Sequence, residues 1–433
     1  MYFKTLKEKL RSRKAKIGVI GLGYVGLPLA IEFAEAGFTT IGFEVDAKKV
    51  KKISKGTSYI ADVRSAALKK HVRDKRLKAT SDFGMLRDVQ VIIICVPTPL
   101  RKSKDPDVSY IVSAAEHVKK HLQKGHLLIL ESTTYPGTTR DLVLPMLEKS
   151  GHKCGGDFFL AFSPERVDPS NKTFGIRNTP KIVGGITPQC TELARLLYSN
   201  VTDNAVTVSS PEAAEMVKLL ENTFRAVNIA LVNEVALMCD KLKLDVWEII
   251  DAAATKPFGF MPFYPGPGIG GHCIPLDPQY LSWKLKTLNF YSRFIELAGE
   301  INSKMPEYVV RKISDSLNAK GISMKNAKIL LVGLAYKKDV NDMRESPALD
   351  VMKLLLDSGS RVSYYDPYIP ELKFGGKIYK SAKNLGATGK FDAVAITTNH
   401  TNINYAQLVS TARLVVDCRN ATKNIRNPKI VKL

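Results

Sequence analysis

Short runs of hydrophobic residues alternate with stretches of helical spacing along most of the 433-residue chain. The segment 16–46 contains an apolar run, a glycine-rich turn, a helical pattern and a second apolar run that ends in acidic residues. This order predicts a strand, a helix and a second strand, the unit from which parallel sheets are built. The alternation continues to about residue 200, with strands predicted at 89–96, 126–130 and 157–162 and helices at 107–123 and 138–149.

One long helical period replaces this alternation from Pro211 to about Leu242. Ser209 or Ser210 can cap the start of this helix, and Pro211 suits its first turn. A helix of about 30 residues spans about 45 Å, which is more than one small domain needs. We therefore expect the helix to join two domains and to offer a packing surface to a second subunit.

Strand signals resume in the last third of the chain, after a Pro/Gly-rich stretch at 256–281 and a helical region that reaches about residue 305. The pattern predicts a helix that opens at Ser346 and Pro347, and strands at 327–336, 361–367, 391–400 and 413–418. The expected fold is α/β, with two Rossmann-like doubly wound domains joined by a long central helix. The predicted division is 1–205, 206–305 and 306–433.

Composition narrows the class of protein. No apolar run approaches the roughly 20 residues that a bilayer span requires, so no stable membrane insertion is expected. The basic segment 1–16 lacks a long apolar core, and we interpret it as a solvated helix rather than a signal peptide. The six cysteines are widely spaced, and no Cys/His pattern suits zinc, so a cytoplasmic location and no metal site are expected.

The net charge of +22 favours anionic partners, which include nucleic acids, membrane surfaces and phosphorylated small molecules. The positive residues are scattered along the chain instead of gathering in a basic segment with interleaved aromatic residues. We therefore expect a phosphorylated small molecule as the partner, and no nucleic acid.

The glycine turn at 21–26 has the spacing of a dinucleotide-binding fingerprint. Gly21 permits a tight turn, Gly23 lets a pyrophosphate approach the backbone, and Gly26 lets the helix lie close to the strand. Glu44 ends the second strand, where a carboxylate accepts hydrogen bonds from an adenosine ribose and repels a 2′-phosphate. NAD is therefore favoured, although Lys48 and Lys49 leave NADP open. The turn at Gly333 lacks the other fingerprint glycines, so the last domain is expected to hold something other than a dinucleotide.

Cys273 lies in the glycine-rich stretch GIGGHCIPLD and is followed by Asp277. An accessible thiol among backbone amides is a candidate nucleophile, while a buried apolar cysteine is the alternative. His272 is its neighbour in sequence, but we do not expect it to act as the base. The other five cysteines are interpreted as structural.

Two further pairs of residues are candidates for chemistry. Lys218 and Asn222 are four residues apart, so they share one face of the long helix and can polarise a carbonyl or hold a water; a solvated helix face is the alternative. Glu165 and Arg166 follow a predicted strand at the end where open α/β sheets bind ligands. Glu165 can act as a base there, and a loop salt bridge is the alternative.

Several longer strings occur together in one order: GLGYVGLPLA at 21–30, CVPTPL at 95–100, ESTTYPGTT at 131–139, SPERVDP at 163–169, KLLEN at 218–222, PGPGIGGHCIPLDP at 265–278 and AYKKDVNDMRESPA at 335–348. Over nearly its full length the chain resembles the UDP-sugar 6-dehydrogenases. The resemblance implies an NAD-binding domain at 1–205, a central helical domain with the cysteine loop at 206–305 and a UDP-sugar-binding domain at 306–433.

The resemblance also implies a reaction and roles for particular residues. A UDP-sugar is oxidised at C6 from alcohol to carboxylate with two NAD, and the aldehyde stage is captured by Cys273 as a thiohemiacetal and then a thioester. Lys218 and Asn222 match the pair that stabilises oxyanions, and Asp277 matches the acid that helps to activate water. Glu165 matches the glutamate of thioester hydrolysis, and Thr133 matches a threonine that positions water.

Binding residues follow from the same match. The implied cofactor contacts are Gly21, Gly23, Tyr24, Val25, Gly26, Glu44, Lys49, Pro97, Thr98, Thr133 and Arg344. The implied substrate contacts are Glu165, Arg166, Lys218, Asn222, Tyr264, Gly270 and Lys337. A homodimer or higher homo-oligomer is expected.

The strings GGHCIPLDP and SPERVDP look more like the branch that acts on UDP-N-acetylhexosamines than like the UDP-glucose enzymes. UDP-N-acetylglucosamine is the expected substrate, and the product is expected to supply surface polysaccharide. UDP-glucose and the manno or galacto epimers of the acetamido sugar are alternatives. A non-catalytic NAD-binding sensor is the alternative of another class, and it would not need Cys273.

Overall fold

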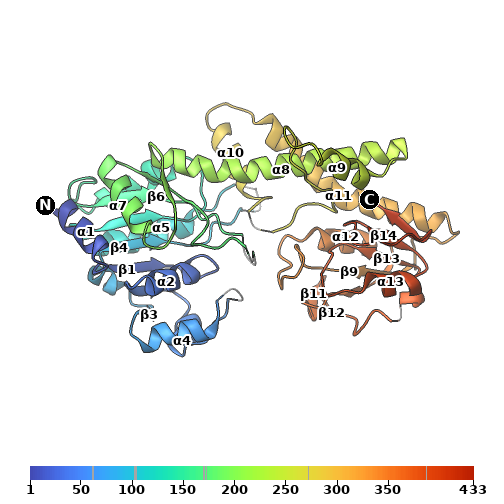
Figure 1. Ribbon diagram of the computed structural model, residues 1–433, viewed down its shortest axis with the longest axis horizontal. Coiled ribbons are helices and arrows are strands. Elements are labelled where there is room, and N and C mark those ends of the chain that lie inside the picture. The colour runs from blue at the N-terminus through green and yellow to red at the C-terminus, as the bar shows by residue number, and fades with distance from the viewer. Residues whose placement is uncertain (61–62, 102–104, 169–170, 172, 272, 387) are drawn as a thin grey trace. The chain divides into compact units, whose positions relative to one another are not determined.

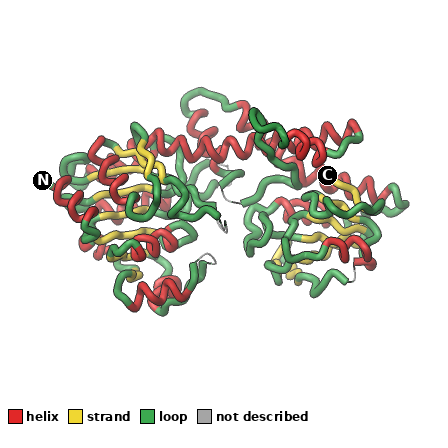
Figure 2. Tube along the Cα trace, in the orientation of Figure 1, coloured by secondary structure: helices red, strands yellow, loops and turns green. Residues whose placement is uncertain are grey.

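The structure is a computed structural model of the whole chain, and it describes all residues except 61–62, 102–104, 169–170, 172, 272 and 387. The chain divides into two compact units (Figure 1). Unit 1 contains Met1–Glu221 and Gln279–Asn289, and unit 2 contains Asn222–Pro278 and Phe290–Leu433. In each unit, strands gather in the interior and helices lie outside them (Figure 2).

The described part of unit 1 contains one eight-stranded sheet. Its strands are β1 (Lys16–Ile20), β2 (Thr39–Phe43), β3 (Leu77–Thr80), β4 (Val91–Ile94), β5 (Leu127–Leu130), β6 (Phe159–Phe162), β7 (Lys181–Gly185) and β8 (Ala205–Thr207). Their order is β3-β2-β1-β4-β5-β6-β7-β8, and only β6 and β7 pair antiparallel. The direction of growth reverses between β1 and β4, where doubly wound sheets bind their ligands.

Alternating side chains of the sheet enter two different hydrophobic cores. Val91 and Ile93 of β4 belong to one core, whereas Ile92 and Ile94 belong to the other. Because both faces are buried, the strands are apolar throughout rather than alternating with polar residues. The helical segments of unit 1 before residue 200 are α1 (Tyr2–Arg11), α2 (Gly26–Glu35), α3 (Ala47–Ser54), α4 (Ser65–Arg73), η1 (Phe83–Asp88), α5 (Ser109–His121), η2 (Thr138–Val143), α6 (Leu144–Glu148) and α7 (Pro188–Tyr198).

Helix α1 corrects the interpretation of the basic leader as a solvated helix. Leu6 and Leu10 are buried in the core of unit 1, and the ring of Phe3 packs edge-on against Phe159 with 6.1 Å between centroids. The lysines and arginines occupy the remaining faces. The leader is thus amphipathic, and one of its faces belongs to the core.

The long helix α8 runs over Pro211–Leu242, as the sequence pattern predicts. Ser210 caps its start, because its Oγ accepts a hydrogen bond from the Ala213 N–H at 3.2 Å. The boundary between the two units falls within this helix, after Glu221. Helix α10 (Asp277–Lys286) also begins in unit 2 and continues in unit 1.

The described part of unit 2 contains a five-stranded parallel sheet in the order β10-β9-β13-β14-β15, which confirms a second doubly wound domain. Its strands are β9 (Lys328–Val332), β10 (Arg361–Tyr365), β13 (Ala393–Ile396), β14 (Val415–Asp417) and β15 (Ile430–Lys432). The remaining elements are α9 (Val246–Ala253), α11 (Arg293–Asn318), α12 (Pro347–Asp357), η3 (Thr388–Lys390), α13 (Tyr405–Thr411) and a hairpin of β11 (Glu371–Phe374) and β12 (Lys377–Lys380).

The cysteines differ in exposure. Cys273 is exposed, Cys154 is partly buried, and the other four are buried. The Sγ atoms of Cys154 and Cys190 lie 3.9 Å apart. Among the described residues, no helix combines the length and the apolar composition needed to cross a membrane.

Candidate active site

The three fingerprint glycines have different surroundings. Gly21 has φ +89°, and a Cβ there would lie 2.5 Å from the carbonyl oxygen of Cys95. A Cβ on Gly26 would lie 1.9 Å from the Gly21 oxygen, so α2 can start this close to β1 only with glycine. A Cβ on Gly23 would meet no atom of the protein within 4 Å. Gly23 therefore faces open space at the start of α2, where a pyrophosphate fits.

Glu44 is fixed directly after β2. Its Oε2 accepts a hydrogen bond from the Leu22 N–H at 3.2 Å, and its Oε1 accepts one from the Asp46 N–H at 3.1 Å. Lys49 Nζ lies 3.5 Å from Oε2. These contacts hold the carboxylate beside the glycine turn, where a dinucleotide ribose lies. The charge of Lys49 is paired with Glu44, which weakens the case for NADP.

The remaining predicted cofactor residues of unit 1 lie at the same edge of the sheet. Tyr24 and Val25 belong to the turn before α2, Pro97 and Thr98 follow β4, and Thr133 follows β5. The Thr98 carbonyl accepts a hydrogen bond from the Tyr280 hydroxyl at 2.5 Å. Since the carboxyl ends of parallel strands meet at one edge, these segments surround the glycine turn.

Glu165 follows β6, and both its carboxylate oxygens are held. Oε1 accepts hydrogen bonds from the N–H groups of Arg166 at 2.8 Å and Val167 at 2.6 Å, and Oε2 lies 3.0 Å from Lys181 Nζ. Burial opposes ionisation of this carboxyl, but the Lys181 charge, the Val167 N–H and the Lys218 charge outweigh it, so the pKa of Glu165 lies below its usual value. Glu165 is therefore an ionised acceptor.

Arg166 does not form a salt bridge with Glu165. Its guanidinium contacts Glu221 Oε1 at 2.5 Å and the Pro180 carbonyl at 2.5 Å. Lys218 and Asn222 are buried on α8, with 9% and 5% of their surfaces exposed, so the alternative of a solvated helix face is wrong. The structure thus places Glu165, Arg166 and Lys218 in unit 1.

The cysteine loop brings a second set of predicted residues together in unit 2. Asn222 Nδ2 donates a hydrogen bond to Asp277 Oδ2 at 2.5 Å. The Asp277 N–H donates to the Cys273 carbonyl at 2.8 Å, so the thiol-bearing residue and the carboxylate share one turn. The Cys273 side chain is exposed, and the alternative of a buried structural cysteine is wrong for this position.

Glycines let the cysteine loop pack against the segment after β9. A Cβ on Gly270 would lie 2.7 Å from both the Glu345 oxygen and the Tyr336 Cβ. A Cβ on Gly266 would lie 2.4 Å from the Arg419 guanidinium. The loop is anchored at its start, because the Gly266 N–H donates to Asn233 Oδ1 at 3.0 Å. The strings at 265–278 and 335–348 therefore meet in unit 2.

The other predicted ligand contacts of unit 2 are placed as follows. The Tyr264 hydroxyl donates to Asp251 Oδ1 at 2.8 Å, and its ring stacks on Trp247. Arg344 pairs with Asp342 at 2.6 Å. Lys337 follows Tyr336 in the segment against which the cysteine loop packs. His272 lies outside the described residues.

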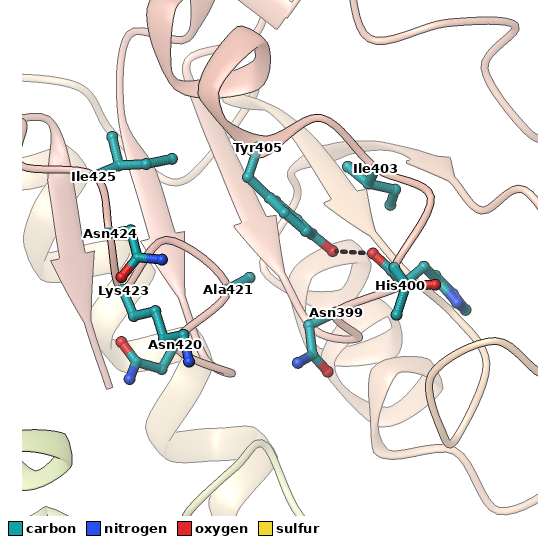
Figure 3. Close-up of a pocket in the computed structure, with 10 residues that line it drawn as sticks. Asn399, His400, Ile403, Tyr405, Asn420, Ala421, Lys423, Asn424 and Ile425 are labelled. Atoms are coloured by element: carbon teal, nitrogen blue, oxygen red, sulfur yellow. Dashed lines mark hydrogen bonds between the residues drawn. The ribbon is translucent and has the colours of Figure 1, made fainter. Parts of the chain in front are cut away.

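A pocket of about 350 Å³ opens between the segments that follow β13 and β14 (Figure 3). Its polar lining includes Asn399, Asn420, Asn424 and Lys423, and the Tyr405 hydroxyl donates to the His400 carbonyl at one side. It lies at the carboxyl edge of the sheet, as ligand sites of α/β folds do. Of the residues that the structure describes there, none was singled out from the sequence.

Sequence reasoning also missed the partners of Glu165. Lys181 opens β7, and Glu131 follows β5; the two side chains lie 2.6 Å apart. Glu131 is part of the string ESTTYPGTT, but its neighbours in the chain give no sign of a lysine 50 residues away. A charged residue at the start of the otherwise apolar KIVGG was the signal available for Lys181.

Comparison with known protein families places the chain in a class of enzymes. Residues 15–202 match the NAD binding domain, residues 212–304 the central domain and residues 330–424 the UDP binding domain of the UDP-glucose/GDP-mannose dehydrogenase family. These matches define an NAD-dependent oxidoreductase. The chain belongs to the UDP-glucose/GDP-mannose dehydrogenase family.

Individual relatives match this chain over most of its length and most of their own. The chain is 36% identical over 356 residues to UDP-N-acetyl-D-glucosamine 6-dehydrogenase of Pseudomonas aeruginosa, covering 82% of this chain and 83% of that protein. It is 35% identical over 415 residues to UDP-N-acetyl-D-mannosamine dehydrogenase of Pyrococcus horikoshii, covering 94% and 96%. A solved structure of UDP-D-ManNAc dehydrogenase from P. horikoshii superimposes with a TM-score of 0.87 at 34% identity, covering 96% of this chain and 98% of that one.

Proposed function

We propose that this protein oxidises the C6 hydroxymethyl group of UDP-N-acetylglucosamine to a carboxylate, with two NAD consumed in turn, and so supplies a uronic acid for surface polysaccharide. The observation that carries the proposal is the exposed Cys273 thiol on a glycine-rich loop in one turn with Asp277. Support for the acetamido sugar comes from relatives at 35–36% identity that act on the gluco and manno forms.

Cys273 performs the step that lets one site oxidise twice. Its thiolate attacks the C6 aldehyde and forms a C–S bond, which gives the oxyanion of a thiohemiacetal, and this oxyanion loses a hydride from C6 to become a thioester. NAD, when bound at the fingerprint, accepts the hydride of each oxidation. Water then cleaves the thioester, which releases the carboxylate and restores the thiol.

The neighbouring residues have matching roles in this proposal. The Asn222 amide and the Lys218 ammonium stabilise the oxyanions that form on the C6 oxygen. Asp277, hydrogen-bonded to Asn222, assists the water. Glu165 directs the attack on the thioester, and Thr133 positions the water. The ionised state of Glu165 supports its role as an acceptor for a water proton.

The proposed contacts of the cofactor and the substrate complete the site. The glycine turn holds the pyrophosphate, and Glu44 accepts hydrogen bonds from the ribose. Lys49, Pro97, Thr98 and Arg344 contact the cofactor, and Arg166, Tyr264, Gly270 and Lys337 contact the UDP-sugar. The domain division 1–205, 206–305 and 306–433 belongs to the same proposal; the three family domains, matched at 15–202, 212–304 and 330–424, support it.

The manno epimer is the second candidate substrate. The relative that covers most of the chain among those described above, at 94%, acts on UDP-N-acetyl-D-mannosamine. The two sugars differ at one stereocentre, at C2. If only the manno form is turned over, UDP-N-acetylmannosamine is the substrate. If only UDP-glucose is turned over, the proposal of an acetamido sugar as the substrate is wrong.

The central test is the amount of NADH formed per UDP-sugar consumed. We expect two, because each conversion of alcohol to acid removes four electrons. Cys273→Ala should lower uronate formation by about 1000-fold or more, because no covalent intermediate forms. Binding of NAD should persist in this variant, which shows that it is folded. Full oxidation by Cys273→Ala would overturn the mechanism, and an NADH yield of one would indicate an ordinary alcohol dehydrogenase.

We further propose that the protein works in the cytoplasm as a homodimer. Free thiols, including the exposed Cys273, support a reducing compartment. The dimer is supported by exposed apolar side chains on α8 within unit 2, namely Phe224, Leu231 and Met238. These residues recur every seven positions, so they lie along one face of the helix.

A further inference from the structure

A buried network of charges lies behind Glu165 in unit 1. Lys181 Nζ is 2.6 Å from Glu131 Oε1 and 3.0 Å from Glu165 Oε2. The side chains of Lys181 and Glu131 are 6% and 0% exposed, whereas that of Glu165 is 14% exposed. Glu165 is therefore the member that reaches toward solvent, and the other two lie beneath it.

The network fixes the Glu165 carboxylate from two directions. Two backbone N–H groups hold Oε1, and Lys181 holds Oε2. Lys181 is held in turn by Glu131, whose Oε1 also accepts a hydrogen bond from the Tyr198 hydroxyl at 2.7 Å. The anchor thus extends from α7 through the end of β5 to the start of β7. A carboxylate held in this way has little freedom to rotate.

The pKa values of the three charged residues in the network are shifted in different directions. Burial disfavours the Lys181 cation, but Glu131 and Glu165 outweigh burial and raise its pKa above the usual value. Burial raises the pKa of Glu131, with Lys181 opposing. Glu165 alone has a lowered pKa, and Lys181 is the largest cause that lowers it. The lysine therefore keeps Glu165 ionised.

Stability alone is a poor reason for this arrangement. Three charged groups have lost most of their water, and the desolvation cost of buried ion pairs often equals or exceeds their attraction. The rest of β7 is apolar and buried, so an apolar residue at its first position would fit the pattern of the strand. A charge kept at such a position points to a role in the chemistry of Glu165.

We propose that Lys181, held by Glu131, is a positioning residue that keeps Glu165 ionised and correctly oriented for cleavage of the Cys273 thioester. The proposal rests on the role given to Glu165 above. Lys181 does not contact the reacting atoms, so it acts on the hydrolytic step through Glu165. Its loss should leave the binding of NAD and of the UDP-sugar almost unchanged.

The test compares three variants and one matched control with the wild-type enzyme. Lys181→Met together with Glu131→Gln removes one positive and one negative charge, so the net charge of the network is unchanged and Glu165 alone loses its cation. Lys181→Arg keeps the cation, and Glu165→Gln removes the carboxylate. Lys7→Met together with Glu192→Gln is the matched control, because this lysine–glutamate pair of unit 1 is 2.5 Å apart but its side chains are 27% and 40% exposed.

In the double variant at Lys181 and Glu131 we expect kcat to fall by about 100-fold, as misorientation of a reacting group does. KM for both substrates should fall together with kcat, so that kcat/KM stays within about threefold, because the slowed hydrolysis follows formation of the thioester. A sugar thioester on Cys273 should accumulate, visible by mass spectrometry of the quenched enzyme. The acid limb of kcat should move to higher pH, because Glu165 loses the cation that favours its ionised form. In Lys181→Arg the acid limb of kcat should stay at its wild-type pH, because the cation beside Glu165 is kept.

The other titratable groups around Glu165 and Lys181 are Glu131 after β5, Tyr198 on α7, Cys95 after β4 and Lys218 on α8. Wild-type Tyr198, Cys95 and Lys218 remain in every variant, so the shift can be assigned to the Lys181–Glu131 pair, and a wild-type acid limb in Lys181→Arg assigns it to the cation. A folded double variant with the kcat and pH profile of the control would overturn the proposal. If Glu165→Gln itself keeps full kcat, the role of Glu165 has failed, and the proposal for Lys181 fails with it.

Discussion

Glu44 is the residue that decides between NAD and NADP. It is 6% exposed and is fixed by the N–H groups of Leu22 and Asp46. Its carboxylate accepts from the ribose and repels a 2′-phosphate. Because a hydrogen bond to a charged group is worth about 1.5–3 kcal/mol, Glu44→Gln should lower kcat/KM for NAD by about 10- to 100-fold.

The same substitution should raise the relative use of NADP, since Lys48 and Lys49 remain and the repulsion is gone. Steady-state kinetics with both cofactors measure the ratio. Glu35→Gln, at the exposed end of α2, is the control and should change neither value. An unchanged NAD:NADP ratio in Glu44→Gln would show that the carboxylate does not read the ribose.

At the scale of elements, Glu215 on α8 ties this helix to the turn at 137–139. Its carboxylate accepts hydrogen bonds from the N–H groups of Gly137 at 2.6 Å and Thr139 at 2.9 Å, and from the Thr139 hydroxyl at 2.7 Å. Burial raises the pKa of Glu215 to about 7. The contacts satisfy two N–H groups at the start of η2.

This pKa predicts a pH dependence of stability. An unfolded glutamate has a pKa of about 4.3, so between about pH 4.5 and 7 the folded protein binds a proton that the unfolded chain has lost. The free energy of unfolding should therefore fall as the pH rises through this window, by up to about 3 kcal/mol. Glu215→Gln should lose this part of the fall, as measured by urea unfolding of unit 1 at several pH values.

Glu212 on the same helix provides the control. Burial opposes its ionisation, but hydrogen bonds from Arg140 and Ser210 outweigh it and lower the pKa of Glu212. Glu212→Gln should therefore leave the fall between pH 4.5 and 7 in place. Equal slopes for the wild-type protein and Glu215→Gln would contradict the prediction.

At the scale of the whole molecule, the exposed stripe on α8 predicts self-association. Phe224, Leu231 and Met238 are 45%, 53% and 50% exposed, which is costly for apolar groups in water. Leu231→Asp places a charge in the middle of the stripe. We expect it to weaken the dimer by about 30-fold or more, as the loss of a central contact residue does.

Light scattering over a dilution series measures this change. Lys320→Asp, at an exposed position outside α8, is the control for the added negative charge and should stay dimeric. A wild-type protein that is monomeric at micromolar concentration would contradict the proposal for the dimer. Equal dissociation of the two variants would show that the stripe is not the interface.

Local periodicity was enough to predict much of the fold. The bounds of α8 follow from a helical period with a serine cap, and the apolar strands follow from runs of buried residues. The hairpin of β11 and β12 was missed, although Gly375 and Gly376, with φ of +54° and +76°, form the two-residue turn that favours such a hairpin. The buried face of α1 was missed because the basic residues concealed its two leucines.

The candidate site also consists of residues that the sequence indicated and of contacts that only the structure shows. The sequence by itself indicated the glycine turn, the cysteine loop and the pair on α8, because each is a pattern of residues close together in the chain, and it indicated Glu44 because this residue ends the strand that follows the glycine turn and its helix. Only the tertiary structure decided that Lys181 joins Glu131 to Glu165, and that Asn222 meets Asp277. Those contacts depend on which strands lie side by side and where a loop returns, and long-range packing sets both.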